Sequence, residues 1–176
     1  MPQVTYNIDP SHSSVHFSVR HLMVSNVRGE FSKLSGTILI DSDNPASSSV
    51  QAVIDVDSIN TREPQRDGHL KSADFLDVEK FPTITFRSTQ VTLEEGGAKV
   101  TGDLTIHGVT QPITLEVEGS TDEIKDPWGN QRIGMSAAAK LSRKEFGLTW
   151  NAALETGGFM VGDEVKVTID LEAVRA

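Results

Sequence analysis

The chain has 176 residues, 37% of them hydrophobic, and a formal net charge of −9. This length fits a single domain, and the composition is that of a soluble globular protein without an integral membrane segment. The acidic residues are spread along the chain, so electrostatic repulsion argues against nucleic acid as a partner. The absence of cysteine excludes thiolate chemistry, disulfide bonds and cysteine-bound zinc.

Residues 1–6 contain neither the basic segment nor the apolar segment of a secretory signal. We therefore expect a cytoplasmic protein. A periplasmic location is the alternative if a signal peptide has been trimmed from this sequence.

Apolar and polar residues alternate at short spacing through the whole chain, which predicts β-strands with one apolar face each. The first such face carries Val15, Phe17 and Val19. Further apolar faces follow at 38–40, 50–56, 84–86, 100–106, 113–117, 135–141 and 165–171. Turn-forming residues separate them, as in EGG at 95–97 and DPWGN at 126–130.

About eight strands joined by short loops predict an all-β meander. Such a sheet forms a sandwich or closes into a barrel, and closure removes the exposed edges that invite aggregation. We therefore predict a single domain over 1–176, built as one antiparallel eight-stranded β-barrel. Alternation alone leaves open whether the interior is hollow or filled.

Two segments interrupt the alternation. Residues 65–75 are polar and irregular, which predicts a short helix or lid that is interrupted by Gly68. Residues 142–159 mix charged, aromatic and glycine residues, which indicates an excursion over one barrel mouth. One or two short helical segments are thus expected near a mouth.

The familiar catalytic and metal-binding patterns are incomplete. His12 and His16 lie about 13 Å apart on an extended chain, too far to share an ion. The DSDN segment at 41–44 starts like a calcium loop but lacks the later glycine and glutamate. GMSAA at 134–138 lies inside a strand, without the helix that a nucleophile elbow requires. We expect no metal, no cofactor and no enzymatic activity.

Six stretches together resemble the YceI-like family of polyisoprenoid-binding proteins. They are DPSHSSVHFSVRH at 9–21, VRGEF at 27–31, RDGHLKSADFL at 66–76, FPTITF at 81–86, GDLTIHGVT at 102–110 and SRKEFG at 142–147. Each stretch is weak by itself, but their order and spacing span nearly the whole chain.

The resemblance implies a lipocalin-like, extended eight-stranded barrel that binds isoprenoid or other long-chain lipids in its lumen, without established catalysis. We therefore expect the protein to bind and sequester or carry a polyisoprenoid or a fatty-acid-like amphiphile. A lipid-modifying enzyme, or a stress-related interaction module with a filled barrel, are the alternatives. A homodimer of such barrels is left open.

The apolar tail of this lipid would lie along the barrel axis and bind by buried area. The residues expected around it are Val15, Phe17, Val19, Phe31, Ile84, Phe86, Leu104 and Ile106.

The polar head would stay at a mouth, because burying it unpaired in an apolar lumen costs several kcal/mol. His21 shares the parity of Phe17 and Val19 and is the leading candidate to contact the head. The irregular segments and the residues beside them add further candidates. The expected cationic hydrogen-bond donors are Arg66, His69 and Arg143. The aromatic residues expected to wall the entrance are Phe75, Phe81 and Trp150. Arginines that only fix a loop, and aromatic rings that only plug the core end, are the alternatives.

Overall fold

The structure, a computed structural model, describes residues 3–151 and 160–176. Within these ranges the strands are β1 (Gln3–Ile8), β2 (Ser14–His21), β3 (Ser25–Phe31), β4 (Leu34–Asp41), β5 (Ser49–Asp55), β6 (Ile59–Asn60), β7 (Thr83–Glu94), β8 (Gly97–Ile106), β9 (Val109–Glu118), β10 (Ile124–Lys125), β11 (Gln131–Ser142) and β12 (Val161–Arg175). The α-helix is α1 (Pro64–Lys71), and short 3-10 helices cover Pro10–His12, Pro45–Ser47, Val56–Ser58 and Arg143–Phe146. No helix among these residues has the length and apolar character needed to cross a bilayer.

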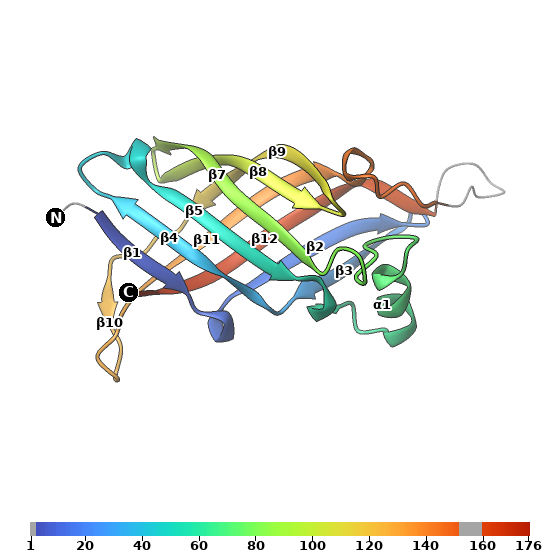
Figure 1. Cartoon of the computed structure of the whole chain (residues 1–176), viewed down its shortest axis with the longest axis horizontal. Coiled ribbons are helices and arrows are strands. Elements are labelled where there is room, and N and C mark those ends of the chain that lie inside the picture. Colours follow the sequence, from blue (N-terminus) through green and yellow to red (C-terminus); the bar gives the residue numbers. More distant parts are fainter. Residues whose placement is uncertain (1–2, 152–159) are drawn as a thin grey trace.

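The strands form one antiparallel sheet that closes on itself (Figure 1). Its order is β10-β11-β9-β8-β7-β5-β4-β1-β12-β2-β3-β6, and the pairing of β11 with β12 closes the ring. That closing ladder runs from Arg132 opposite Val174 to Ser142 opposite Glu164. The predicted closed barrel is therefore confirmed.

Three of the barrel strands are broken in the middle. β1 and β2 both pair with β12. In the next layer of pairing, β4 pairs with β1 and β3 pairs with β2. Beyond them, β5 pairs with β4 and β6 pairs with β3. Counted as continuous strands, β1/β2, β3/β4 and β5/β6 with β7, β8, β9, β11 and β12 give the eight predicted strands across the described residues. The first break falls at Pro10, which has no N–H for the ladder.

The predicted helix at 65–75 is observed as α1, which begins at Pro64 and ends at Lys71. The Glu63 side chain caps it by accepting from the Arg66 N–H at 2.6 Å. Gly68 lies inside the helix and does not interrupt it, contrary to our expectation. The predicted excursion at 142–159 begins with the 3-10 helix Arg143–Phe146, and its part 152–159 lies outside the described residues.

The two barrel ends differ. α1 and the β2–β3 hairpin lie at one end, and β10 with the C-terminus at the other (Figure 1). Near the β10 end, Tyr6, Ile133 and the fully buried Ala173 fill the interior, and the Tyr6 hydroxyl donates to Glu123 at 2.7 Å. We call this packed end the floor.

On the outer surface near the floor, Arg132 links two segments of the chain through hydrogen bonds to carboxylates. Arg132 Nε donates to Asp126 at 2.6 Å, and its Nη1 donates to Asp9 at 2.7 Å. Glu172 lies 3.4 Å from the same Nη1. The guanidinium is the main reason that the pKa of Asp9 and the pKa of Asp126 both lie below their ordinary value of 3.8. This network joins the β1–β2 break to the β10–β11 hairpin.

The network predicts an acid-sensitive stability. Because both carboxyl pKa values are depressed by folding, their stabilisation is complete above about pH 5 and is lost as the pH falls through the folded values. Arg132→Gln should lower the urea midpoint near neutral pH and flatten its further decline between about pH 5 and about pH 2. Arg175→Gln removes an exposed charge at the same end, which pairs with Glu123, and should leave the acid-range slope unchanged. An Arg132→Gln curve that runs parallel to the parent curve would contradict this account.

Candidate functional site

The barrel encloses a cavity of about 360 Å³. Its lining on β12 extends from Val161 to Leu171, ten residue steps. At about 3.3 Å per step and a strand tilt of about 40°, this corresponds to a length of about 25 Å along the axis. The cavity is thus long and narrow, a shape that suits an extended chain.

The eight residues expected around an apolar tail all lie on this wall: Val15, Phe17, Val19, Phe31, Ile84, Phe86, Leu104 and Ile106. The inward faces of β4, β5, β9, β11 and β12 add further aliphatic residues. These positions alternate with outward-facing residues that are mostly polar, as the period of two requires.

Two glycines explain how phenyl rings fit on the wall of so narrow a barrel. A Cβ on Gly29 would lie 2.5 Å from the Phe17 ring, and one on Gly102 would lie 2.6 Å from the Phe86 ring. Each ring therefore occupies the space that a side chain on the neighbouring strand would fill. The rings pack against the backbone at these glycines, and the axis stays open.

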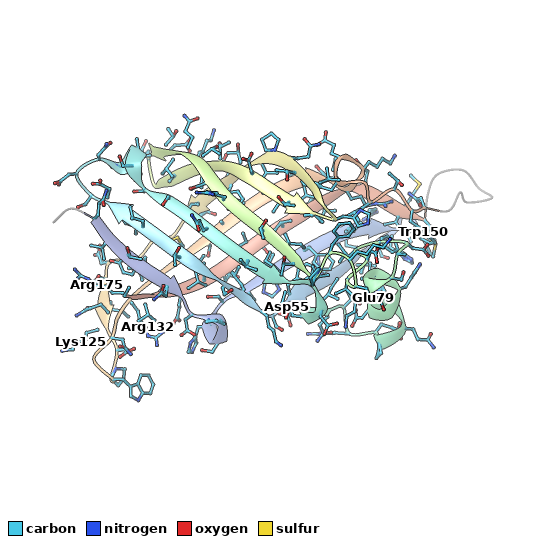
Figure 2. All side chains as sticks on the ribbon, in the orientation of Figure 1. Asp55, Glu79, Lys125, Arg132, Trp150 and Arg175 are labelled. Atoms are coloured by element: carbon cyan, nitrogen blue, oxygen red, sulfur yellow. The ribbon has the colours of Figure 1, made fainter. Side chains whose placement is uncertain are left out.

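Polar lining is confined to the end opposite the floor, which we call the mouth. Among the described residues that line the cavity, the five with titratable side chains are all basic: Arg20, His21, Arg66, His69 and Arg143. Trp150 lies at this end, far from Lys125 at the floor end (Figure 2). An otherwise apolar cavity thus has a basic rim on one side.

Arg143 lines this rim, but its donors are directed at backbone. Its side chain is 4% exposed and donates to the carbonyls of Leu148, Trp150, Val161 and Gly162 at 2.7 to 3.2 Å. Burial lowers the pKa of its guanidinium. Arg143 therefore holds the loop after β11 against the start of β12, the alternative role that the sequence left open for the arginines.

Arg66 is also partly committed to its own loop. Its Nε donates to the Thr61 hydroxyl at 2.8 Å, and its Nη2 donates to the Thr61 carbonyl at 2.6 Å. These bonds fix the start of α1 against the end of β6. The side chain still reaches the cavity lining.

Three rings form a cluster beside the basic rim. His69 makes edge contacts with Phe75 and Trp150, with ring centroids 5.0 and 4.9 Å away, and Phe75 lies 5.1 Å from Trp150. His69 Nε2 lies 2.9 Å from an Asp74 carboxylate oxygen, which orients the imidazole. This cluster narrows the mouth with apolar surface.

Phe81 is the one predicted site residue that the structure places away from the cavity. Its ring packs on His107, with centroids 4.8 Å apart, and against the turn at Gly108. The inward residues of β7, Ile84 and Phe86, have even numbers, so Phe81 has the opposite parity. Phe81 thus packs outside the cavity lining, and its place in the wall of the entrance stays a prediction.

The sequence analysis missed Arg20 and several apolar residues. Alternation with Val15, Phe17 and Val19 would place Arg20 on the outer face, but the β2–β12 register shifts between Val161 and Val165, and Arg20 reaches the rim. Leu70, Leu76 and Leu148 also line the cavity from irregular segments. No strand periodicity could have identified these three.

One cluster has the composition of a metal site. Ligand atoms of Asp9, His12 and Glu172 lie within 4.8 Å of one another on the outer surface. Arg132 already donates to Asp9 and approaches Glu172, so an arginine supplies the positive charge that these carboxylates need. The donor set does not favour an added cation.

Comparisons with known proteins agree with this architecture. The chain is 38% identical to Protein YceI of Salmonella newport over 174 residues, which cover 97% of this chain and 86% of that protein. A crystal structure of the Campylobacter jejuni YCEI protein is 31% identical, with a TM-score of 0.73 over 89% of this chain and 90% of that one.

Two more distant structures share the fold. Burkholderia cenocepacia BcnA has a TM-score of 0.81 at 23% identity, covering 94% of this chain and 98% of that one. A polyisoprenoid binding domain from Saccharophagus degradans has a TM-score of 0.69 at 20% identity, covering 98% and 99%. The model of the YceI-like domain matches residues 6–173. The chain therefore belongs to the YceI-like family.

Proposed function

We propose that this protein binds a lipid with a long apolar chain, which lies along the barrel axis while its polar head stays at the mouth. One observation carries the proposal: the cavity is apolar along its length and has polar side chains only at one end, all of them basic among the described residues. A polyisoprenoid or a fatty-acid-like chain has the matching shape and polarity.

The tail would be bound by contact area. Each buried methylene contributes about 0.8 kcal/mol, so a chain of about fifteen carbons gains roughly 12 kcal/mol before the costs of ordering and association. The lumen offers hydrogen-bonding groups only near its rim. Chain length should therefore govern affinity more than chemical detail along the tail.

The head would meet the basic rim. His21 projects into the cavity at the last residue of β2, and Arg20 lies beside it. The buried Arg143 adds positive charge next to this rim, although its hydrogen bonds go to backbone carbonyls. An acidic or strongly accepting head, such as a phosphate, carboxylate or phenol, suits this set.

The name of one structural relative points to the same ligand class. The Saccharophagus degradans domain with the same fold is described as polyisoprenoid-binding. At 20% identity the likeness concerns the fold, so the ligand class is part of our proposal for this chain.

The two alternatives receive less support. A filled barrel is difficult to reconcile with a cavity of about 360 Å³. A lipid-modifying enzyme needs a nucleophile or an acid–base pair in the lumen, whereas no hydroxyl, thiol or carboxyl side chain is found among the described lining residues. His69 with Asp74 is a histidine–carboxylate pair at the mouth, without a nucleophile in this lining.

Narrowing the lumen should weaken binding. Ala139 faces the cavity, whereas Ala138 on the same strand is exposed. A phenyl group at position 139 would displace on the order of three methylenes, so Ala139→Phe should raise the Kd for a fluorescent long-chain fatty acid roughly fiftyfold. Prenyl alcohols, used as competitors, extend the same titration to isoprenoid chains.

Ala138→Phe is the matched control for this test, since it adds the same ring outside the barrel. Both variants should give the circular dichroism spectrum and cooperative melting of the parent. Equal binding by Ala139→Phe and Ala138→Phe would show that the ligand does not occupy the lumen.

Affinity should also depend on chain length and then saturate. Each added methylene should lower the Kd about fourfold until the chain reaches the floor, and further carbons should add nothing. A titration series of saturated fatty acids measures this. An affinity that is independent of length, or that rises without a limit, would place the ligand on an open surface.

A further inference from the structure

The turn between β2 and β3 exposes three consecutive apolar side chains at the mouth. Leu22 is 40% exposed, Met23 58% and Val24 75%. We call these three residues the apolar tip. Scattered exposed apolar residues are ordinary, but a contiguous group at a binding-site entrance usually marks a contact surface.

The backbone of this turn makes the choice of residues notable. Leu22 and Met23 have φ angles of 51° and 61°, in the left-handed region that asparagine and glycine occupy with least strain. The turn is closed by the Val24 N–H, which donates to the His21 carbonyl at 3.1 Å. The positive φ angles of the turn therefore do not explain why leucine and methionine occupy these two positions.

The strands around the apolar tip carry positive charge in an otherwise acidic protein. Residues 14–29 contain Arg20 and Arg28 and no acidic residue, whereas the whole chain has a net charge of −9. The one acid of these two strands, Glu30, lies near the far end of β3 from the tip. Arg20 Nη2 also donates to the Met23 carbonyl at 3.2 Å. Charges beyond about 10 Å are largely screened at moderate salt. A surface touching the tip therefore responds first to Arg20, whereas Arg28 lies four residues along β3 from Val24, about 13 Å away in an extended strand.

The neighbouring strand β12 does carry acids near its start. Asp163 accepts hydrogen bonds from the Ser142 hydroxyl at 2.5 Å and from the Lys144 N–H at 3.0 Å, which directs it toward β11. Glu164 lies opposite Ser142 in the ladder with β11. In the register of β12 with β2, Asp163 lies level with Arg20, between the pairs Val161–His21 and Val165–Val19, and Glu164 lies one residue further from the tip.

The floor end provides a contrast within the same molecule. Ile124 and Trp128 are 63% and 80% exposed there. Residues 121–130 contain three acids and one lysine, and two of the acids pair with arginines, Asp126 with Arg132 and Glu123 with Arg175. The exposed apolar group at the floor end thus lies among paired charges of both signs, whereas the segment 14–29 around the tip contains arginines and no acid.

We propose that the apolar tip inserts into a lipid bilayer that contains anionic lipids, and that it thereby seats the cavity mouth on the membrane surface. Arg20 and His21, which flank the tip in sequence, also line the cavity, so the inserted turn and the entrance are one continuous surface. Apolar side chains anchor in the interface while arginines meet lipid phosphates. The reason for such docking rests on the proposed lipid binding, but membrane contact itself can be measured without a bound lipid.

Vesicle sedimentation of the delipidated full chain tests the proposal. The parent protein should bind vesicles of phosphatidylcholine containing phosphatidylglycerol, and bind pure phosphatidylcholine vesicles more weakly. The double variant Leu22→Asn/Met23→Gly should lower the partition coefficient by more than about tenfold, because it removes most of the inserting surface. It should melt no lower than the parent, since Asn-Gly suits the positive φ angles.

Two further variants separate charge from apolar contact. Arg28→Gln should weaken binding to the anionic vesicles about fivefold and leave binding to the neutral ones unchanged. Trp128→Ser removes a larger exposed apolar side chain from the floor end and should bind vesicles as the parent does. Loss of binding in Trp128→Ser, with the tip variant unaffected, would overturn the proposal.

Tryptophan fluorescence reports the orientation. The chain has two tryptophans, so Trp128→Ser leaves only Trp150 at the mouth, and Trp150→Phe leaves only Trp128 at the floor end. Nitroxide-labelled lipids in the vesicles should quench Trp150 and spare Trp128. The reverse pattern would contradict membrane contact at the mouth.

The remaining outcomes are distinguishable. If Ala139→Phe sediments with vesicles as the parent does but binds fatty acid roughly fiftyfold more weakly, docking and lumen binding are separate steps, as we infer. If the parent binds fatty acid but no vesicles, the docking proposal fails and the proposed function stands. If the parent is a dimer that Leu22→Asn/Met23→Gly dissociates, without vesicle binding, the tip is instead an interface between two copies of the chain.

Discussion

The open lumen depends on how far the inward side chains reach toward the barrel axis. A barrel of eight strands is narrow enough for its side chains to fill it. Alanines at 52, 137 and 139, and the glycines beside the Phe17 and Phe86 rings, keep the wall away from the axis. Groups that face such a void lose dispersion contacts on one side, and a bound hydrocarbon chain would restore them. The open lumen would therefore both leave room for an apolar chain and favour its binding.

The difference between the two ends gives the cavity a direction. At the floor, Tyr6, Ile133 and Ala173 are packed, and Arg132 joins Asp9 to Asp126 outside them. At the mouth, Arg143 donates to backbone carbonyls of the loop after β11 and of the start of β12, and so holds the two segments together. The backbone on this side of the entrance is therefore fixed by a buried side chain. Under the proposed function, a polar head would meet basic groups at one end only, and the tail would point to the floor.

Periodicity is why so much of the fold could be predicted from sequence. With a side-chain period of two, Val15, Phe17 and Val19 had to share a face, and closing eight such strands turns these faces inward. The features that sequence could not show depend on partners brought together by the fold. Arg143 reads as a surface cation until the carbonyls around it are known, and Asp9 and Arg132 lie 123 residues apart. The β2–β3 turn was missed because Leu22 and Met23 carry no turn signal.

Native mass spectrometry of protein purified from cells without organic solvent tests the central claim most directly. If the hollow barrel is a lipid site, a fraction of the molecules should carry a defined extra mass that solvent extraction removes and that fragments as a long hydrocarbon chain. The stripped protein should regain such a mass when mixed with a prenyl or fatty ligand. Protein that emerges bare, and stays bare after that mixing, would contradict the account.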